Sequence, residues 1–104
     1  MARRIILYNL ADNVTDEEFY EYVNNDKGPL INSLPTVNKY ELIKITGAPG
    51  GNIPYKYAGI MDFTSHEEFE QKAAGTPQYQ EFLKKFRPMV KDLVMLSGDV
   101  IYSP

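Results

Sequence analysis

The sequence of 104 residues contains no cysteine, which excludes disulfide bonds, thiolate catalysis and cysteine-based zinc sites. It also contains no block of lysine or arginine, and its net charge is −3. Because contacts to nucleic-acid phosphates need clustered basic side chains, nucleic acid is not expected as a partner.

Long apolar runs are missing too. No stretch approaches the length of a membrane span, and the apolar run that follows Arg3 and Arg4 is broken at Asn9, too early for a secretion signal. We therefore expect a cytoplasmic protein that does not associate with membranes.

The residues that are present form an ordinary mixture for a soluble globular protein, with 43% hydrophobic and 24% charged side chains. The length predicts a single domain over residues 1–104. A domain of this size buries only a modest core, so it gains stability from a partner.

Four short segments rich in β-branched and aromatic residues predict strands at 4–10, 36–46, 55–63 and 92–102, the last with a kink or bulge at Gly98. Between the second and third of them, three glycines and two prolines within residues 47–54 predict a long and mobile hairpin loop, which can serve as a lid.

Two related stretches predict the starts of helices: TDEEF at 15–19 and SHEEF at 65–69. In each, Thr15 or Ser65 is expected to be the N-cap, and the glutamate three residues later completes a capping box. Each stretch follows an apolar segment, so the two helices are expected at equivalent points of two similar halves.

The expected ends of these helices follow from glycine and proline. The first helix is expected to end near Asp26, since Gly28 and Pro29 follow, and residues 29–35 are either loop or a single helical turn. The second helix is expected to be split by a new start at 76–77, and Pro88 ends it.

The resulting order is β-α-β-β-α-β, which predicts an α+β, ferredoxin-like fold: a four-stranded antiparallel sheet with helices on one face. The third strand carries apolar residues on both of its faces. The uncovered sheet face is therefore expected to pair with a second copy of the chain in a homodimer.

The segment SLPTVNKYEL at 33–42 resembles the start of the second strand in dimeric α/β-barrel proteins, with Thr36 where glycine is usual. Over nearly its whole length, including ILYNLADNVTDEEFYEYV and GIMDFTSHEEFE, the chain resembles the RedY-like or HapK-like family, whose members are encoded with the biosynthesis of prodiginines, red tripyrrole pigments. The resemblance implies a dimeric α/β barrel.

For function, this resemblance implies a cofactor-independent accessory enzyme of prodiginine-type pigment biosynthesis that acts on an aromatic heterocyclic intermediate. Two alternatives remain open: a non-catalytic protein that binds or carries a pathway intermediate, and a structural dimer within a pathway complex.

The only histidine, His66, is the candidate acid/base catalyst. As the first residue after the N-cap Ser65, it shares the sheet-facing side of its helix with Phe69. The electropositive helix start disfavours a cationic ring, so a neutral imidazole is expected there. The resemblance to cofactor-free enzymes puts a catalytic role on a par with the simpler interpretation, a partly exposed polar residue. Asp16, at the equivalent place, is explained by the helix dipole alone.

The aromatic residues suggest a ligand. Tyrosines from three strands can line a flat pocket for a planar, pyrrole-like molecule: Tyr8, Tyr40, Tyr55 and Tyr57. For most of them, packing in the core or at a dimer interface is the alternative. Asn9 and Asp62 interrupt apolar strands, and one of the two is expected to orient the ligand. A lone histidine with scattered carboxylates does not make a metal site, so none is expected.

Overall fold

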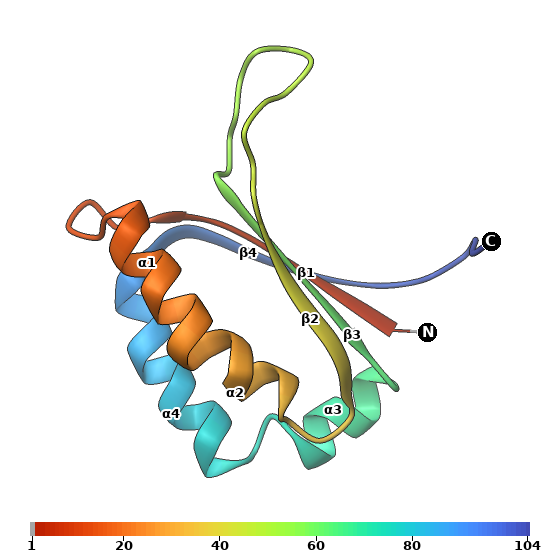
Figure 1. The fold of residues 1–104 in the computed structure, drawn as a ribbon. Helices are drawn as coiled ribbons and strands as arrows, with labels where there is room; N and C mark the ends of the chain where they lie inside the picture. Colours follow the sequence, from red (N-terminus) through yellow and green to blue (C-terminus); the bar gives the residue numbers. More distant parts are fainter. Residues whose placement is uncertain (1) are drawn as a thin grey trace.

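The structure, a computed structural model that describes residues 2–104, is built on one four-stranded antiparallel sheet with its helices on one face (Figure 1). The strands are β1 (Ala2–Leu10), β2 (Val37–Lys44), β3 (Tyr57–Phe63) and β4 (Val90–Asp99), arranged in the order β2-β3-β1-β4. The helical segments are α1 (Asp16–Tyr22), η1 (Val23–Lys27), α2 (Gly28–Asn32), α3 (His66–Lys72), α4 (Pro77–Phe86) and η2 (Arg87–Met89). This topology confirms the predicted ferredoxin-like α+β fold.

The helix starts lie where the capping residues predicted them. The hydroxyl of Thr15 accepts a hydrogen bond from the backbone N–H of Glu18 at 3.1 Å, and the hydroxyl of Ser65 accepts one from Glu68 at 3.0 Å. Thr76 caps α4 in the same way. These bonds satisfy backbone donors that a helix start leaves free, which fixes where each helix leaves the sheet.

The end of the first helix differs from the prediction. The chain does not leave the helix near Asp26 but continues through the π-helical segment η1 and α2 to Asn32. The N–H of Gly28 bonds to the carbonyl of Val23, five residues back. Pro29 has no N–H and its ring crowds the preceding turn of a regular α-helix, so the wider π turn accommodates a sequence that would otherwise end the helix.

The π turn also decides which side chains face the sheet. At about 100° per residue, a regular helix would turn Lys27 about 80° and Ile31 about 120° away from Phe19. The one extra residue of η1 reduces the rotation of Lys27 and Ile31 relative to Phe19 by about 100°, which brings all three to the same side. Phe19, Lys27 and Ile31 are consequently all buried, at 1%, 2% and 1% exposure.

The last strand, β4, ends at Asp99 rather than at the predicted residue 102, and its bulge lies at a different residue from the predicted one. Within the described residues β4 pairs only with β1, and its last paired residue, Asp99, lies opposite Ala2. The bulge is not at Gly98 but at Asp92, which has a φ of +56°, where the register shifts between Leu7 and Asn9 of β1.

The turn into β2 keeps a left-handed conformation without glycine. Thr36 has a φ of +70°, and its carbonyl accepts a hydrogen bond from the N–H of Thr64 at 3.0 Å. A β-branched residue is strained in this conformation. The loop between β2 and β3 projects away from the sheet, as Figure 1 shows. None of the helices within residues 2–104 is long and apolar enough to cross a membrane.

Candidate functional site

Lys27, the last residue of η1, is the one charged side chain that is buried within the described residues. Its Nζ donates a hydrogen bond to the hydroxyl of Tyr8 at 2.9 Å. Five aromatic rings surround the amine, with centroids 4.1 to 6.0 Å from Nζ: Phe86, Tyr8, Phe19, Tyr40 and Phe82. No ion pair within residues 2–104 includes Lys27.

Burial without a counter-ion lowers the pKa of Lys27 from its ordinary value to about 7. Removing an ammonium group from water disfavours its charged form, and the surrounding ring faces compensate only in part. Near neutral pH, a substantial fraction of Lys27 is therefore a neutral amine with a free lone pair.

Tyr8 stands at the centre of the aromatic cluster around this amine. It is fully buried, and its ring stacks on Tyr57 with the centroids 5.8 Å apart. Burial raises the pKa of Tyr8, and the neighbouring Tyr40 and Tyr57 raise it further. The hydroxyl of Tyr8 therefore stays protonated and can act as a hydrogen-bond donor and acceptor beside Lys27.

The other two tyrosines differ in their hydrogen bonding. The Tyr57 hydroxyl donates to Asp16 at 2.7 Å, and Asp16 also pairs with Lys44 at 3.2 Å. These two partners lower the pKa of Asp16. Burial raises the pKa of Tyr40 and the nearby hydroxyl of Tyr8 offsets part of this rise, but the buried hydroxyl of Tyr40 makes no hydrogen bond of good geometry in the described part of the chain. An unpaired buried hydroxyl is costly, so Tyr40 has hydrogen-bonding capacity that a ligand can use.

A cleft of about 940 Å³ lies over this cluster, between α1, η1 and α2 on one side and β2 and β3 on the other. Its apolar lining comes from Phe19, Tyr20, Val23, Tyr40, Leu42 and Tyr57. Phe19 and Tyr40 both line the cleft and place their rings 5.5 Å from Nζ of Lys27. The amine therefore lies directly beneath the cleft floor.

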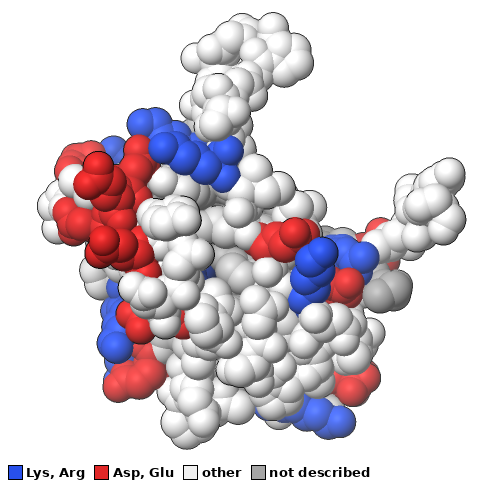
Figure 2. All heavy atoms as spheres, viewed as in Figure 1, with Lys and Arg blue, Asp and Glu red and all other residues white. Residues whose placement is uncertain are grey.

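The rim of the cleft is mainly acidic. Asp16, Glu17 and Glu21 line it together with Lys44. Figure 2 shows the acidic side chains gathered over α1, with basic side chains beside them below the projecting loop. This charge distribution disfavours a polyanionic ligand and suits a neutral or cationic one.

Comparison with known proteins identifies the family. The model of the family described as REDY-like protein HapK matches residues 2–101. The chain belongs to this family. The resemblance noted in the sequence is thereby confirmed.

Similar solved structures share the fold of this HapK-family chain. HapK from Hahella chejuensis has a TM-score of 0.81 at 21% identity, with 100% of this chain and 96% of that chain covered. The hydroxynitrile lyase of Passiflora edulis has a TM-score of 0.82 at 20% identity, with 99% of this chain and 96% of that chain covered. A dimeric ferredoxin-like protein from Thermobifida fusca has a TM-score of 0.73 at 23% identity, with 95% of this chain and 90% of that chain covered. No curated protein sequence matches.

The structure of this HapK-family chain brings three of the predicted site residues together. Tyr8, Tyr40 and Tyr57 all pack around the floor of the cleft, from three different strands. Tyr55 lies outside the cleft lining, in the loop before β3. Ligand binding by the three clustered tyrosines stays a prediction.

Asn9 and Asp62 lie away from the cleft. The Asn9 amide donates to the Pro54 carbonyl and to Asp92 and accepts from the N–H of Lys56, so it ties the base of the projecting loop to β4. Asp62 faces the helix-free side of the sheet.

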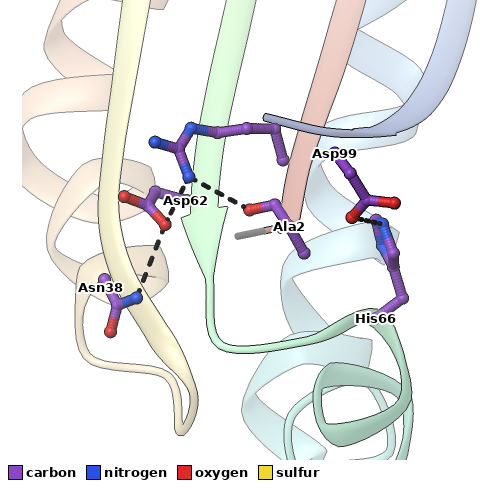
Figure 3. Close-up of polar contacts among 6 residues, drawn as sticks. Ala2, Asn38, Asp62, His66 and Asp99 are labelled. Carbon is purple, nitrogen blue, oxygen red and sulfur yellow. Dashed lines mark hydrogen bonds and ion pairs between the residues drawn. The ribbon is translucent and has the colours of Figure 1, made fainter. Parts of the chain in front are cut away.

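Figure 3 shows Asp62 beside Asn38. Its carboxylate also pairs with Arg3 at 2.8 Å. Protein groups thus contact both the oxygen and the nitrogen of the Asn9 amide and one carboxylate oxygen of Asp62, and neither side chain lines the cleft.

His66 lies beyond the C-terminal end of β3, whereas the cleft lies at the N-terminal end of that strand, near Tyr57. Its Nε2 is 3.7 Å from a carboxylate oxygen of Asp99 (Figure 3), and its ring edge contacts Phe63. Nδ1 is buried without a partner in residues 2–104. Catalysis by His66 stays a prediction, and His66 does not line the cleft.

Sequence reasoning missed Lys27 because it ended the helix at Asp26. One signal was available: Lys27 follows Phe19 and Val23 at intervals of four, so it continues the apolar side of the helix. A lysine on such a side is unusual and points to a special environment. Asp16 was also incompletely explained, because it bonds to Tyr57 and Lys44 in addition to its place at the helix start.

Proposed function

We propose that this chain is a cytoplasmic, cofactor-independent enzyme of prodiginine-type pigment biosynthesis that binds a planar, pyrrole-like molecule in the cleft. Lys27 and Tyr8 transfer a proton to or from this molecule. The observation that carries the proposal is the buried Lys27–Tyr8 pair beneath an aromatic-lined cleft. Membership of the HapK family supports the pathway.

The buried amine is hard to explain by stability alone. An uncompensated buried charge destabilises a fold, and an apolar side chain of similar length would fill the same space at lower cost. What Lys27 supplies instead is a base that is partly neutral at pH 7, held by the protonated hydroxyl of Tyr8. A base whose pKa is close to the working pH is the kind that general acid–base catalysis favours.

The cleft supports an aromatic guest. Its volume falls in the range of small-molecule sites, and the rings of Tyr20, Tyr40 and Tyr57 offer flat surfaces for stacking. The acidic rim favours a neutral or protonated heterocycle over an anion.

A homodimer is part of the proposal. The helix-free sheet face exposes Ile5, Ile43 and Leu96 at 41%, 47% and 49%, with Leu7 and Ile60 partly exposed between them. A second copy of the chain would cover this patch. The dimeric state of the similar Thermobifida fusca protein supports this arrangement.

The decisive experiment replaces Lys27 in the producing organism. A strain lacking the gene is complemented with Lys27→Met or with the matched control Lys72→Met, whose lysine is exposed on α3. If Lys27 is the base, Lys27→Met lowers turnover by about 10²–10⁴-fold, and mass spectrometry finds the accumulated intermediate. Full pigment output from Lys27→Met, at normal protein level, would contradict an enzymatic role.

The same strain tests the alternatives. A carrier would keep its output in Lys27→Met and lose it when the cleft is blocked, for example by Val23→Trp. His66→Ala and His66→Asn test the candidate histidine: normal output from both variants, at normal protein level, rules out catalysis by His66.

A further inference from the structure

We propose that the guest of the cleft carries an aldehyde or ketone group and that Lys27 forms an imine with it. This inference rests on the proposed function, since it names the chemical class of the molecule that the cleft binds. It adds a covalent step at the same amine to the proposed proton transfer.

The polar surroundings of Lys27 fit a carbonyl group better than a carbon acid alone. The amine faces only two hydroxyl-bearing rings, those of Tyr8 and Tyr40, and otherwise apolar ones. Tyr40 is 7% exposed, lines the cleft, and its hydroxyl makes no hydrogen bond of good geometry in the described residues. A carbonyl oxygen entering from the cleft would accept a hydrogen bond from that hydroxyl while its carbon meets Nζ.

The charge balance of the pocket also favours an imine. A lysine is nucleophilic only as the neutral amine, which a desolvated site without carboxylates favours. Burial raises the pKa of both Tyr8 and Tyr40, so both remain phenols, which can donate hydrogen bonds and relay a proton that they recover in the same step. The product imine is neutral, and the apolar rings around it keep out the water that would hydrolyse it.

The step balances without an oxidant or a further reactant. The Nζ lone pair forms a C–N bond as the carbonyl π electrons move to oxygen, and that oxygen takes a proton from a phenol. The nitrogen returns one proton to that phenol, which leaves a neutral carbinolamine. The phenol then passes a proton to the hydroxyl, which leaves as water, and the nitrogen gives up its second proton to restore the phenol. One carbonyl compound and one amine give one imine and one water, and hydrolysis reverses the step.

Access to Nζ requires movement at the cleft floor. Phe19 and Tyr40 lie between the cleft and the amine, and Val23 and Gly28, beside Lys27 in η1 and α2, also line the cleft. The Tyr40 ring packs on Gly59, where a Cβ would lie 3.3 Å from the ring. The proposal therefore requires a rotation of the Tyr40 side chain, or of the flexible lysine stem, to open the path.

The test is reductive trapping with pyrrole-2-carbaldehyde. The purified chain is incubated at pH 7 with this aldehyde and sodium cyanoborohydride, and the labelled lysine is found by peptide mass spectrometry. We expect at least tenfold more label on Lys27 than on exposed lysines such as Lys72, because burial among aromatic rings favours the neutral, nucleophilic amine at Lys27. Lys27→Met should abolish the dominant label, and Lys72→Met should leave it unchanged.

Label spread evenly over exposed lysines, or concentrated on Lys44 at the rim, would overturn the imine proposal. Calorimetric titration with the aldehyde and with indole, which lacks a carbonyl, separates the two proposals. Binding of both compounds without a Lys27 adduct would refute the imine alone. If neither compound binds and no adduct forms, both the imine and the proposed aromatic cleft are wrong.

Discussion

Replacing Lys27 by methionine should remove a specific dependence of stability on pH. The unfolded chain keeps a proton on Lys27 up to about pH 10.5, and the folded chain only up to about pH 7. Between these values the unfolded state binds more protons, so the free energy of unfolding of the native sequence rises with pH.

The size of this effect follows from the two pKa values. Their difference corresponds to about 5 kcal/mol at about 1.4 kcal/mol per pKa unit. Between pH 7 and pH 9, the linkage amounts to a rise of about 2 kcal/mol in the free energy of unfolding. Above about pH 10 the sign reverses, because Tyr8, Tyr40 and Tyr57 have raised pKa values and keep protons that the unfolded chain loses.

Lys27→Met should lack the rise between pH 7 and pH 9. At pH 7 the variant avoids burying a charge but leaves the Tyr8 hydroxyl without its partner, a loss of about 1–3 kcal/mol. The two effects oppose each other. We expect Lys27→Met to be at least as stable as the native sequence at pH 7. At pH 9, where the native sequence has gained stability, we expect this advantage to shrink or to reverse.

Urea unfolding followed by circular dichroism at pH 7 and pH 9 measures both quantities, with the exposed Lys72→Met as the control that should keep the native pH dependence. If the native sequence and Lys27→Met change equally between the two pH values, Lys27 does not titrate near neutrality, and the argument for a reactive amine fails.

Three further variants test other features. Gly28→Ala should lower the free energy of unfolding by about 2 kcal/mol or more in urea, because its Cβ would lie 2.8 Å from the carbonyl oxygen of Val23; an unchanged midpoint would contradict the π turn. Thr36→Gly should raise that free energy by about 1 kcal/mol by relieving the positive φ, and a loss would show that the threonine is not strained. Leu96→Glu should convert a dimer to monomers in sedimentation velocity, whereas Met95→Glu, on the opposite face of β4, should not; a native monomer would refute the dimer.

Local signals in the sequence predicted most of the fold. Thr15, Ser65 and Thr76 marked helix starts because their hydroxyls bond to nearby backbone N–H groups, a contact that depends only on a few adjacent residues. Strand order followed from the alternation of helices and strands. The end of β4 could not be predicted, since it depends on the register of its pairing with β1.

Only part of the candidate site was predicted from the sequence. The aromatic residues Tyr8, Tyr40 and Tyr57 were found because tyrosine is conspicuous in strands, and the fold then determined which of them meet. Lys27 was missed because Gly28 and Pro29 predicted a helix end at Asp26, whereas the π turn carries the helix past them and buries Lys27. His66 attracted attention because it is the only histidine, yet the cleft forms at the other end of β3.

Because of the π segment, the number of residues between Phe19 and Lys27 matters to the candidate site as much as the residue types do. Deleting one exposed residue such as Asn25 would turn η1 into regular α-helix and leave Phe19, Lys27 and Ile31 on one side. It would also place the ring of Pro29 against the carbonyl four residues before it, at about 3 kcal/mol. The extra residue of η1 and Pro29 therefore compensate for each other. A related chain that lacks the extra residue would be expected to lack the proline too. In such a chain the amine of Lys27 would still be buried at the same position.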